Sequence, residues 1–206
     1  MSNAPKNASE KSFQENFVRS LEKYKWTAPH FLNGNIKKVT VNDLINNWRR
    51  ELNRINADML EGVELTDNEF KQVMTQVNKI RNSYEAAKIL SMEESVGKID
   101  GIYRDDNPKV TRKQITLTIF KKAEVRGGDS SYQIAREVVT ENNNRFDIVL
   151  LINGLPLINI EQKRSDKSLD EAYGQFIRYY RDGEYCNNFM AFSQMMVITT
   201  EIETRY

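Results

Sequence analysis

The chain has 206 residues, enough for one domain with a full hydrophobic core, and 39% of them are hydrophobic and 29% charged, as in ordinary globular proteins. Its formal net charge of +1 excludes a bulk polycation, so a nucleic acid would have to bind a local basic patch. One cysteine and one histidine exclude an intramolecular disulfide and argue against a Cys/His zinc site. With no apolar run near the ~18 residues of a membrane span, we expect a cytoplasmic protein without a membrane partner.

The N-terminal half is predicted to be mostly helical. Residues 1–8 are polar and are expected to be disordered, whereas apolar residues recur at helical spacing from Ser9 to about Tyr24, with Ser9 or Ser12 as the N-cap. Residues 40–95 carry a second amphipathic stripe after Thr40 and a short helix at 83–91. We interpret 40–95 as a helical insert in a single domain that spans 9–206.

A capping box, Thr66 followed by Glu69, opens another helix inside this insert. Gly62 separates that helix from the one after Thr40.

The C-terminal half changes to the short runs rich in Ile, Val and Thr that are typical of strands. Strands are predicted at 98–104, 114–120, 132–139, 146–153, 157–163 and 195–200, with a helix at 169–181. The tetrapeptide Asn153-Gly154-Leu155-Pro156 indicates a turn between two of the strands. Strands framed by helices predict an α/β fold whose mixed central sheet is flanked by helices on both sides.

The strands around this turn carry the residues of greatest chemical interest. Asp147 stands near the start of the first strand and Glu161 near the end of the second, so an antiparallel hairpin brings the two carboxylates together. Two buried carboxylates repel each other unless a cation lies between them, and oxygen ligands suit Mg²⁺. Lys163 shares a strand face with Glu161 and could orient water or stabilise charge during phosphodiester hydrolysis. The alternative is a structural salt bridge between Lys163 and the acids.

Glu-x-Lys occurs twice, and the pattern alone is weak. Glu69-Phe70-Lys71 lies in a predicted helix without a hairpin partner, and we interpret it as a solvated helix face. The hairpin context distinguishes the second copy.

The helix that follows the hairpin carries two polar residues on one face. Gln175 and Tyr179 are four residues apart, and Ala172 on the same face permits close approach to the sheet. Either both polar groups reach the metal site or a DNA phosphate, or Tyr179 is core packing and Gln175 is incidental.

A basic stretch at 109–126 contains six cations and a single acid, Glu124. It is either a nucleic-acid patch or a strand edge protected by lysines. The candidates for DNA contact are Lys121, Lys122, Arg126 and, beyond the stretch, Arg164.

The order Asp147, NGLP turn, Glu161-x-Lys163 and Gln175-xxx-Tyr179 resembles the PD-(D/E)xK nuclease signature. More narrowly, it resembles the N-terminal nuclease domain of the restriction (R) subunit of type I restriction-modification enzymes. Similar segments at 10–21, 52–56 and 65–70 extend the resemblance over most of the chain from about residue 10. Phe146 stands where the broad signature has proline.

The resemblance implies a restriction-endonuclease-like fold and a Mg²⁺-dependent endonuclease that cleaves double-stranded DNA. The implied metal ligands are Asp147, Glu161 and the Gln162 carbonyl, and Lys163 is the implied catalytic lysine. Gln175 and Tyr179 are implied in cleavage or DNA positioning, and Glu10 is a possible additional acid from the first helix.

The resemblance also implies that ATP binds motor domains of the same polypeptide that lie outside this chain. Methyltransferase and specificity subunits would be further partners. Two alternatives remain: a PD-(D/E)xK repair or recombination nuclease, and a non-catalytic DNA-binding or assembly module of the same fold.

Overall fold

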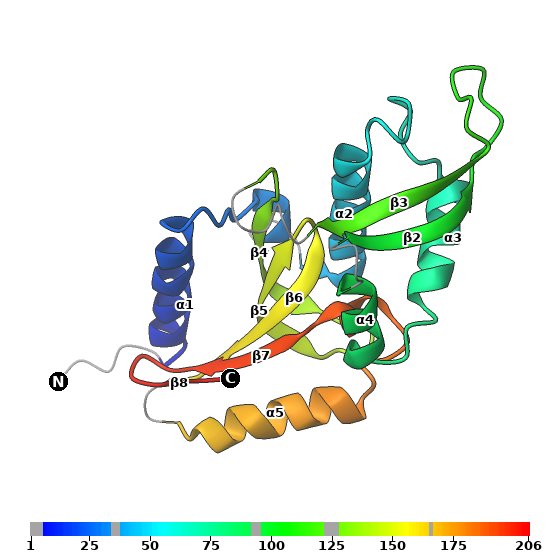
Figure 1. Ribbon diagram of the computed structural model, residues 1–206. Coiled ribbons are helices and arrows are strands. Elements are labelled where there is room, and N and C mark those ends of the chain that lie inside the picture. The colour runs from blue at the N-terminus through cyan, green and yellow to red at the C-terminus, as the bar shows by residue number, and fades with distance from the viewer. Residues whose placement is uncertain (1–5, 34–37, 92–95, 122–127, 165–166) are drawn as a thin grey trace.

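A six-stranded mixed sheet forms the centre of the computed structural model, which describes residues 6–33, 38–91, 96–121, 128–164 and 167–206 (Figure 1). Its strand order is β1-β4-β5-β6-β7-β8, with β1 parallel to β4, β6 parallel to β7, and the other neighbours antiparallel. The strands are β1 (Val39–Thr40), β4 (Tyr132–Val139), β5 (Arg145–Ile152), β6 (Leu155–Gln162), β7 (Met195–Thr199) and β8 (Thr204–Arg205). Buried β5 and β6 lie in the middle because their nearly continuous apolar runs need cover on both faces.

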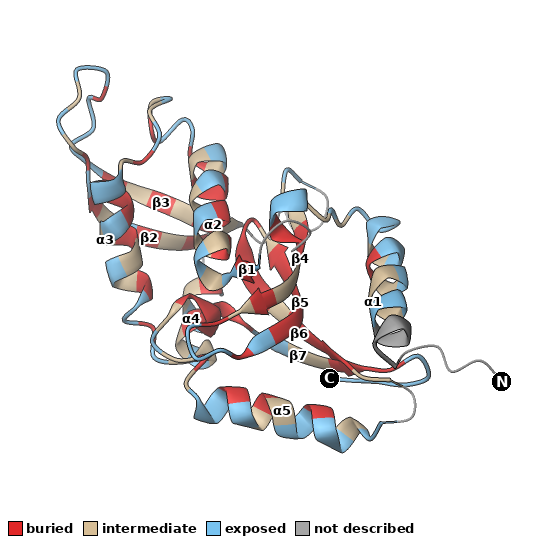
Figure 2. Ribbon diagram, turned by 180° about the vertical axis from the view of Figure 1, so that it is seen from behind, coloured by how far each residue is buried: buried red, intermediate tan, exposed pale blue. Residues whose placement is uncertain are grey.

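Helices cover both faces of this sheet, as predicted. α1 (Lys6–Glu22) packs Val18 against Ile134, Ile148 and Ile160 on one face. The opposite face packs against α2 (Val41–Ile55), α5 (Leu169–Arg181) and the short η3 helix (Phe189–Phe192) in a larger core (Figure 2). The η1 turn (His30–Leu32) lies between α1 and β1.

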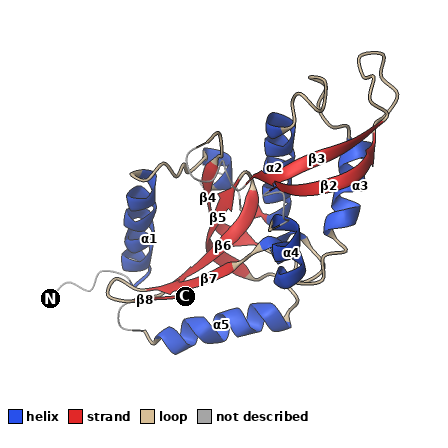
Figure 3. Ribbon diagram, in the orientation of Figure 1, coloured by secondary structure: helices blue, strands red, loops and turns tan. Residues whose placement is uncertain are grey.

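A second, smaller layer extends from α2 (Figure 3). It contains α3 (Asp67–Val77), α4 (Ser83–Leu90), β2 (Val96–Tyr103) and β3 (Gln114–Lys121). The two strands form their own antiparallel sheet instead of joining the central one, which sequence periodicity could not distinguish. Their buried residues belong to the same apolar cluster as those of the central sheet, so this layer is continuous with the main core.

Local signals placed most helix ends correctly. The predicted capping boxes at Thr40 and Thr66 are both present. The first helix, however, begins at Lys6, so Ser9 and Ser12 lie inside it rather than at its N-cap. Residues 6–8 are therefore helical, whereas 1–5 lie outside the described residues.

The turn of the β5–β6 hairpin is shorter than the predicted tetrapeptide. Leu155 and Pro156 already belong to β6, which leaves Asn153 (φ 51°) and Gly154 (φ 78°) as a two-residue turn. A Cβ on Gly154 would lie 2.8 Å from the Trp48 Cα, so α2 packs directly on the turn. None of the described helices is long and apolar enough to cross a membrane.

Candidate active site

The β5–β6 hairpin brings the predicted acidic residues together. Ile148 pairs with Ile160, and continuing this register places Asp147 beside Glu161. The Asp147 Oδ2 accepts a hydrogen bond of 2.9 Å from the Gln162 backbone N–H. Lys163 Nζ lies 2.7 Å from Glu161 Oε1, so all three central residues of the sequence prediction meet at this end of the hairpin.

Burial and mutual repulsion perturb both carboxyl groups. Burial raises the pKa of Asp147 above its ordinary value, although the Gln162 N–H and the Lys163 charge oppose the shift. Burial, followed by the negative charge of Asp147, raises the pKa of Glu161 to about 8. The negative charge of Asp147 raises the pKa of Glu161, so the simultaneous ionisation of both carboxyl groups is unfavourable. Lys163 supplies one positive charge beside two carboxyl groups, so a bound cation would offset the remaining negative charge when both are ionised.

The donor set fits a hard divalent cation. Asp147 and Glu161 offer carboxylate oxygens, and the Gln162 carbonyl between Glu161 and Lys163 is a possible third ligand. Both polar atoms of the buried Gln162 side-chain amide lack a partner among the described residues. The described part of the chain contains no group of three His, Cys, Asp or Glu side chains that could hold a metal ion, so Asp147 and Glu161 are the acidic ligands that it offers. The predicted acid Glu10 has a side chain outside the described part of the chain.

The hydrogen bonds of Gln175 and Tyr179 reach the backbone of β5 rather than the carboxylates. Tyr179 is buried in the core, as one interpretation held, but its hydroxyl donates a 2.6 Å hydrogen bond to the Arg145 carbonyl. Gln175 donates to the same hydroxyl, so it is not incidental. The Phe146 ring packs edge-on against Tyr179 at 5.1 Å. Burial raises the pKa of Tyr179 to about 12, with the Glu161 charge as the second cause. The pair therefore fixes β5 two residues before Asp147.

The structure adds neighbours that the sequence did not reveal. Arg145 Nη1 lies 2.9 Å from Glu137 Oε2 in β4, and Arg145 Nη2 lies 4.0 Å from Asp147 Oδ1. Gln14 of α1 donates to Glu137 Oε1 at 3.1 Å and to the Asp147 carbonyl at 3.4 Å. These residues are up to 133 positions apart in sequence, and no local pattern connects them.

A cleft of about 920 Å³ is lined by residues of α1, of the C-terminal part of β4 and of the start of β5, next to Asp147. Both acidic and basic side chains line this cleft. The charged lining residues are Lys11, Glu15, Lys38, Arg136, Glu137, Arg145 and Asp147. The wall therefore combines carboxylates, which are ligands suited to a divalent cation, with basic side chains that could contact phosphates.

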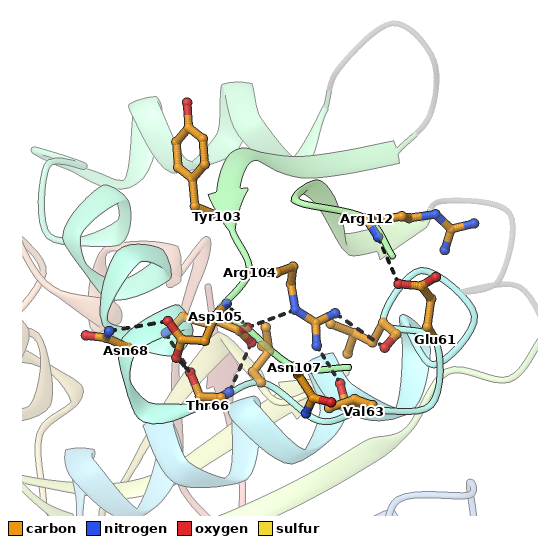
Figure 4. Close-up of polar contacts among 12 residues, drawn as sticks. Glu61, Val63, Thr66, Asn68, Tyr103, Arg104, Asp105, Asn107 and Arg112 are labelled. Atoms are coloured by element: carbon orange, nitrogen blue, oxygen red, sulfur yellow. Dashed lines mark hydrogen bonds and ion pairs between the residues drawn. The ribbon is translucent and has the colours of Figure 1, made fainter. Parts of the chain in front are cut away.

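The basic stretch at 109–126 is only partly described. Lys122 and Arg126 lie outside the described residues, as does the Lys121 side chain, and Arg164 is half-buried. In the loop between β2 and β3, the Arg112 backbone N–H donates to the Glu61 carboxylate (Figure 4). The Arg112 guanidinium donates to the Asp58 and Met59 carbonyls. The DNA contacts assigned to this stretch and to Arg164 remain predictions.

The first Glu-x-Lys is not the solvated helix face that the sequence suggested. Glu69 is 1% exposed, and its carboxylate lies 2.9 Å from the buried Arg104 guanidinium. Figure 4 shows Arg104 and its neighbours Thr66 and Asp105 in this network. The prediction failed because Arg104, which directly follows β2, is 35 residues away in the sequence. Lys71 is exposed, as predicted.

Comparison with known proteins assigns the chain's relatives. Residues 7–206 match the model of the family described as type I restriction enzyme R protein N terminus. Over 175 residues, 82% of this chain, the sequence is 33% identical to the type I restriction enzyme SauMSSORF170P endonuclease subunit of Staphylococcus aureus. It is 24% identical over 220 residues, 93% of this chain and 64% of that protein, to the EcoprrI endonuclease subunit of Escherichia coli. The chain spans only about 17% of the length of the staphylococcal relative.

Proposed function

Because this chain belongs to the family of type I restriction enzyme R protein N termini, with a restriction-endonuclease-like fold, we propose that it is the DNA-cleaving domain of such an enzyme. Its substrate would be double-stranded DNA and its cofactor Mg²⁺. The observation that carries the proposal is the convergence of Asp147, Glu161 and Lys163 at the open end of a buried hairpin.

The chain's own residues divide the work. Asp147, Glu161 and the Gln162 carbonyl would hold the cation, which, when bound, polarises the phosphoryl group and lowers the pKa of a coordinated water. Lys163 keeps Glu161 oriented through the 2.7 Å contact and carries positive charge where charge develops on the phosphate. Gln175 and Tyr179 hold the start of β5, so that Asp147 keeps its position opposite Glu161.

The rest of the enzyme would decide where and when cleavage occurs. The relatives are named endonuclease subunits of type I restriction enzymes, and the staphylococcal one is several times longer than this chain. We assign ATP-driven translocation to motor domains in the remaining polypeptide, and recognition of unmodified foreign DNA to methyltransferase and specificity subunits. Cleavage by this domain would then not require it to read bases.

Two other functions fit less well. Family membership favours a restriction subunit over a repair or recombination nuclease. A non-catalytic binding or assembly module has no use for two repelling carboxylates in one buried site, since burying charge is costly. The perturbed pair therefore favours catalysis.

The test uses the complete restriction enzyme with Asp147→Ala or Lys163→Ala in this subunit. We expect DNA cleavage to fall at least ~10³-fold, as when a catalytic group is removed, while DNA-stimulated ATP hydrolysis persists. Lys71→Ala is the matched control, because Lys71 stands in the same Glu-x-Lys pattern but on an exposed helix face. Cleavage at the normal rate by the Lys163→Ala enzyme would show that the assignment is wrong.

A further inference from the structure

The Arg145 side chain combines a fixed base with an accessible head. Its carbonyl accepts the Tyr179 hydroxyl, and its backbone pairs with Val139 at the start of β5. Its side chain is nevertheless 59% exposed and lines the cleft next to Asp147. A side chain anchored in this way can present a charge to a bound ligand at little conformational cost.

The guanidinium lies between two carboxylates. One terminal nitrogen is 2.9 Å from Glu137, and the other is 4.0 Å from Asp147 Oδ1, beyond hydrogen-bond distance. A guanidinium has five N–H donors, so the Glu137 contact leaves donors available for a further acceptor. A phosphate oxygen suits such a planar fork.

The backbone of Glu137 shows that its position is specifically maintained. Its φ of 55° is left-handed, an unfavourable conformation for a non-glycine residue within a strand. The Gln14 amide of α1 binds the other oxygen of the same carboxylate at 3.1 Å. Helix and strained strand thus hold Glu137 where it orients Arg145.

An ion pair outside the cleft, between Arg81 and Glu85, provides a contrast. Arg81 and Glu85 form an (i,i+4) pair at the start of α4, and no second carboxylate of the described residues is paired with Arg81. Such exposed pairs are common on helices. Glu137 and Arg145, by contrast, come from neighbouring strands and adjoin the candidate metal ligands.

We propose that Arg145 is a catalytic residue that binds a phosphate oxygen of the DNA strand beside Asp147, and that Glu137 is its positioning residue. The proposal rests on the proposed nuclease function. It also gives the Gln175–Tyr179 pair a second task, because that pair holds the backbone from which Arg145 extends.

The experiment uses the full-length subunit, alone and in the complete enzyme, with Arg145→Met, Arg145→Lys and Glu137→Gln. We expect Arg145→Met to lower the cleavage rate about 100-fold, Arg145→Lys about 10-fold and Glu137→Gln several-fold, with ATP hydrolysis unchanged. Arg81→Met is the matched control and should cleave normally.

A second measurement does not depend on cleavage. Binding of a fluorescent duplex in EDTA is followed by anisotropy over a range of salt concentrations. Loss of one phosphate contact should reduce the slope of log K against log[salt] by about 0.9 in Arg145→Met, and leave it unchanged in Arg145→Lys and Arg81→Met.

Three results would overturn the proposal. Cleavage by Arg145→Met at the wild-type rate would remove Arg145 from catalysis. Impaired cleavage by Arg145→Met with an unchanged salt slope would show that Arg145 only supports Asp147 structurally. The same conclusion would follow if the affinity of the Arg145→Met protein for Mn²⁺ fell in parallel with its cleavage rate. If Lys163→Ala is inactive in the same assay, these results contradict the role of Arg145 and leave the nuclease function intact.

Discussion

Glu69-Phe70-Lys71 and Glu161-Gln162-Lys163 share the Glu-x-Lys pattern, and both glutamates are 1% exposed. Their partners differ. The Glu69 carboxylate accepts from the Arg104 guanidinium and from the backbone N–H groups of Asp105 and Thr66. Glu161 has Lys163 on one side and a second carboxylate, Asp147, on the other.

This difference separates a structural carboxylate from one that is proposed to act in catalysis. Glu69 is saturated with donors and balanced by a buried cation that itself binds the Leu60 and Val63 carbonyls. The Glu161 site keeps an excess of negative charge, which would favour binding of a cation. Burial alone is therefore uninformative, and the balance of partners identifies the candidate active site.

The largest expected change in stability comes from breaking the balanced site. Glu69→Gln leaves the buried Arg104 without a counter-charge, and removing one member of a buried ion pair typically costs about 3–5 kcal/mol. Urea denaturation of the chain measures this loss. Glu85→Gln, in an exposed ion pair, should leave the midpoint unchanged. A small effect for Glu69→Gln would mean that Arg104 is satisfied by the carbonyls alone.

Glu161→Gln should stabilise the folded chain, in contrast to Glu69→Gln, and the size of this effect should depend on pH. Burial and Asp147 raise the pKa of Glu161 to about 8, so the folded chain binds this proton more tightly than the unfolded chain. The stability that the carboxyl contributes is complete below its ordinary pKa and is lost as the pH rises through 8. In EDTA at pH 9 we expect Glu161→Gln to be more stable than the wild type by about 1–3 kcal/mol.

At pH 5 the two proteins should unfold together, because a protonated Glu161 is as neutral as glutamine. Thermal denaturation at both pH values provides the comparison. A stability difference of equal size at pH 5 and pH 9 would contradict the raised pKa.

The smallest expected change in stability concerns α5, which supports the candidate active site. Tyr179→Phe removes the hydroxyl that joins Gln175 to the Arg145 carbonyl, at a cost of about 1 kcal/mol for one buried hydrogen bond. Tyr180→Phe is the control, because Tyr180 is the next residue in the helix and is 63% exposed. Equal denaturation midpoints for the two variants would show that the hydroxyl does not hold β5.

The sequence by itself determined the elements and the central pair of acids. Capping boxes at Thr40 and Thr66, strand composition and the Asn153-Gly154 turn act over a few residues, so they can be identified without knowing the fold. An antiparallel hairpin brings its two strand ends side by side, which is why Asp147 and Glu161 could be placed near each other in advance. Their direct pairing also depends on a register shift between Leu150 and Leu151, which the turn does not predict.

Only the tertiary structure decided which residues surround these elements. It placed β2 and β3 in a separate sheet, paired Glu69 with Arg104, and brought Gln14, Glu137 and Arg145 to Asp147. Contacts between residues tens to more than a hundred positions apart depend on how layers pack, and local periodicity carries no record of that packing. The physical reason is that a side chain's charge and burial are set by its neighbours in space.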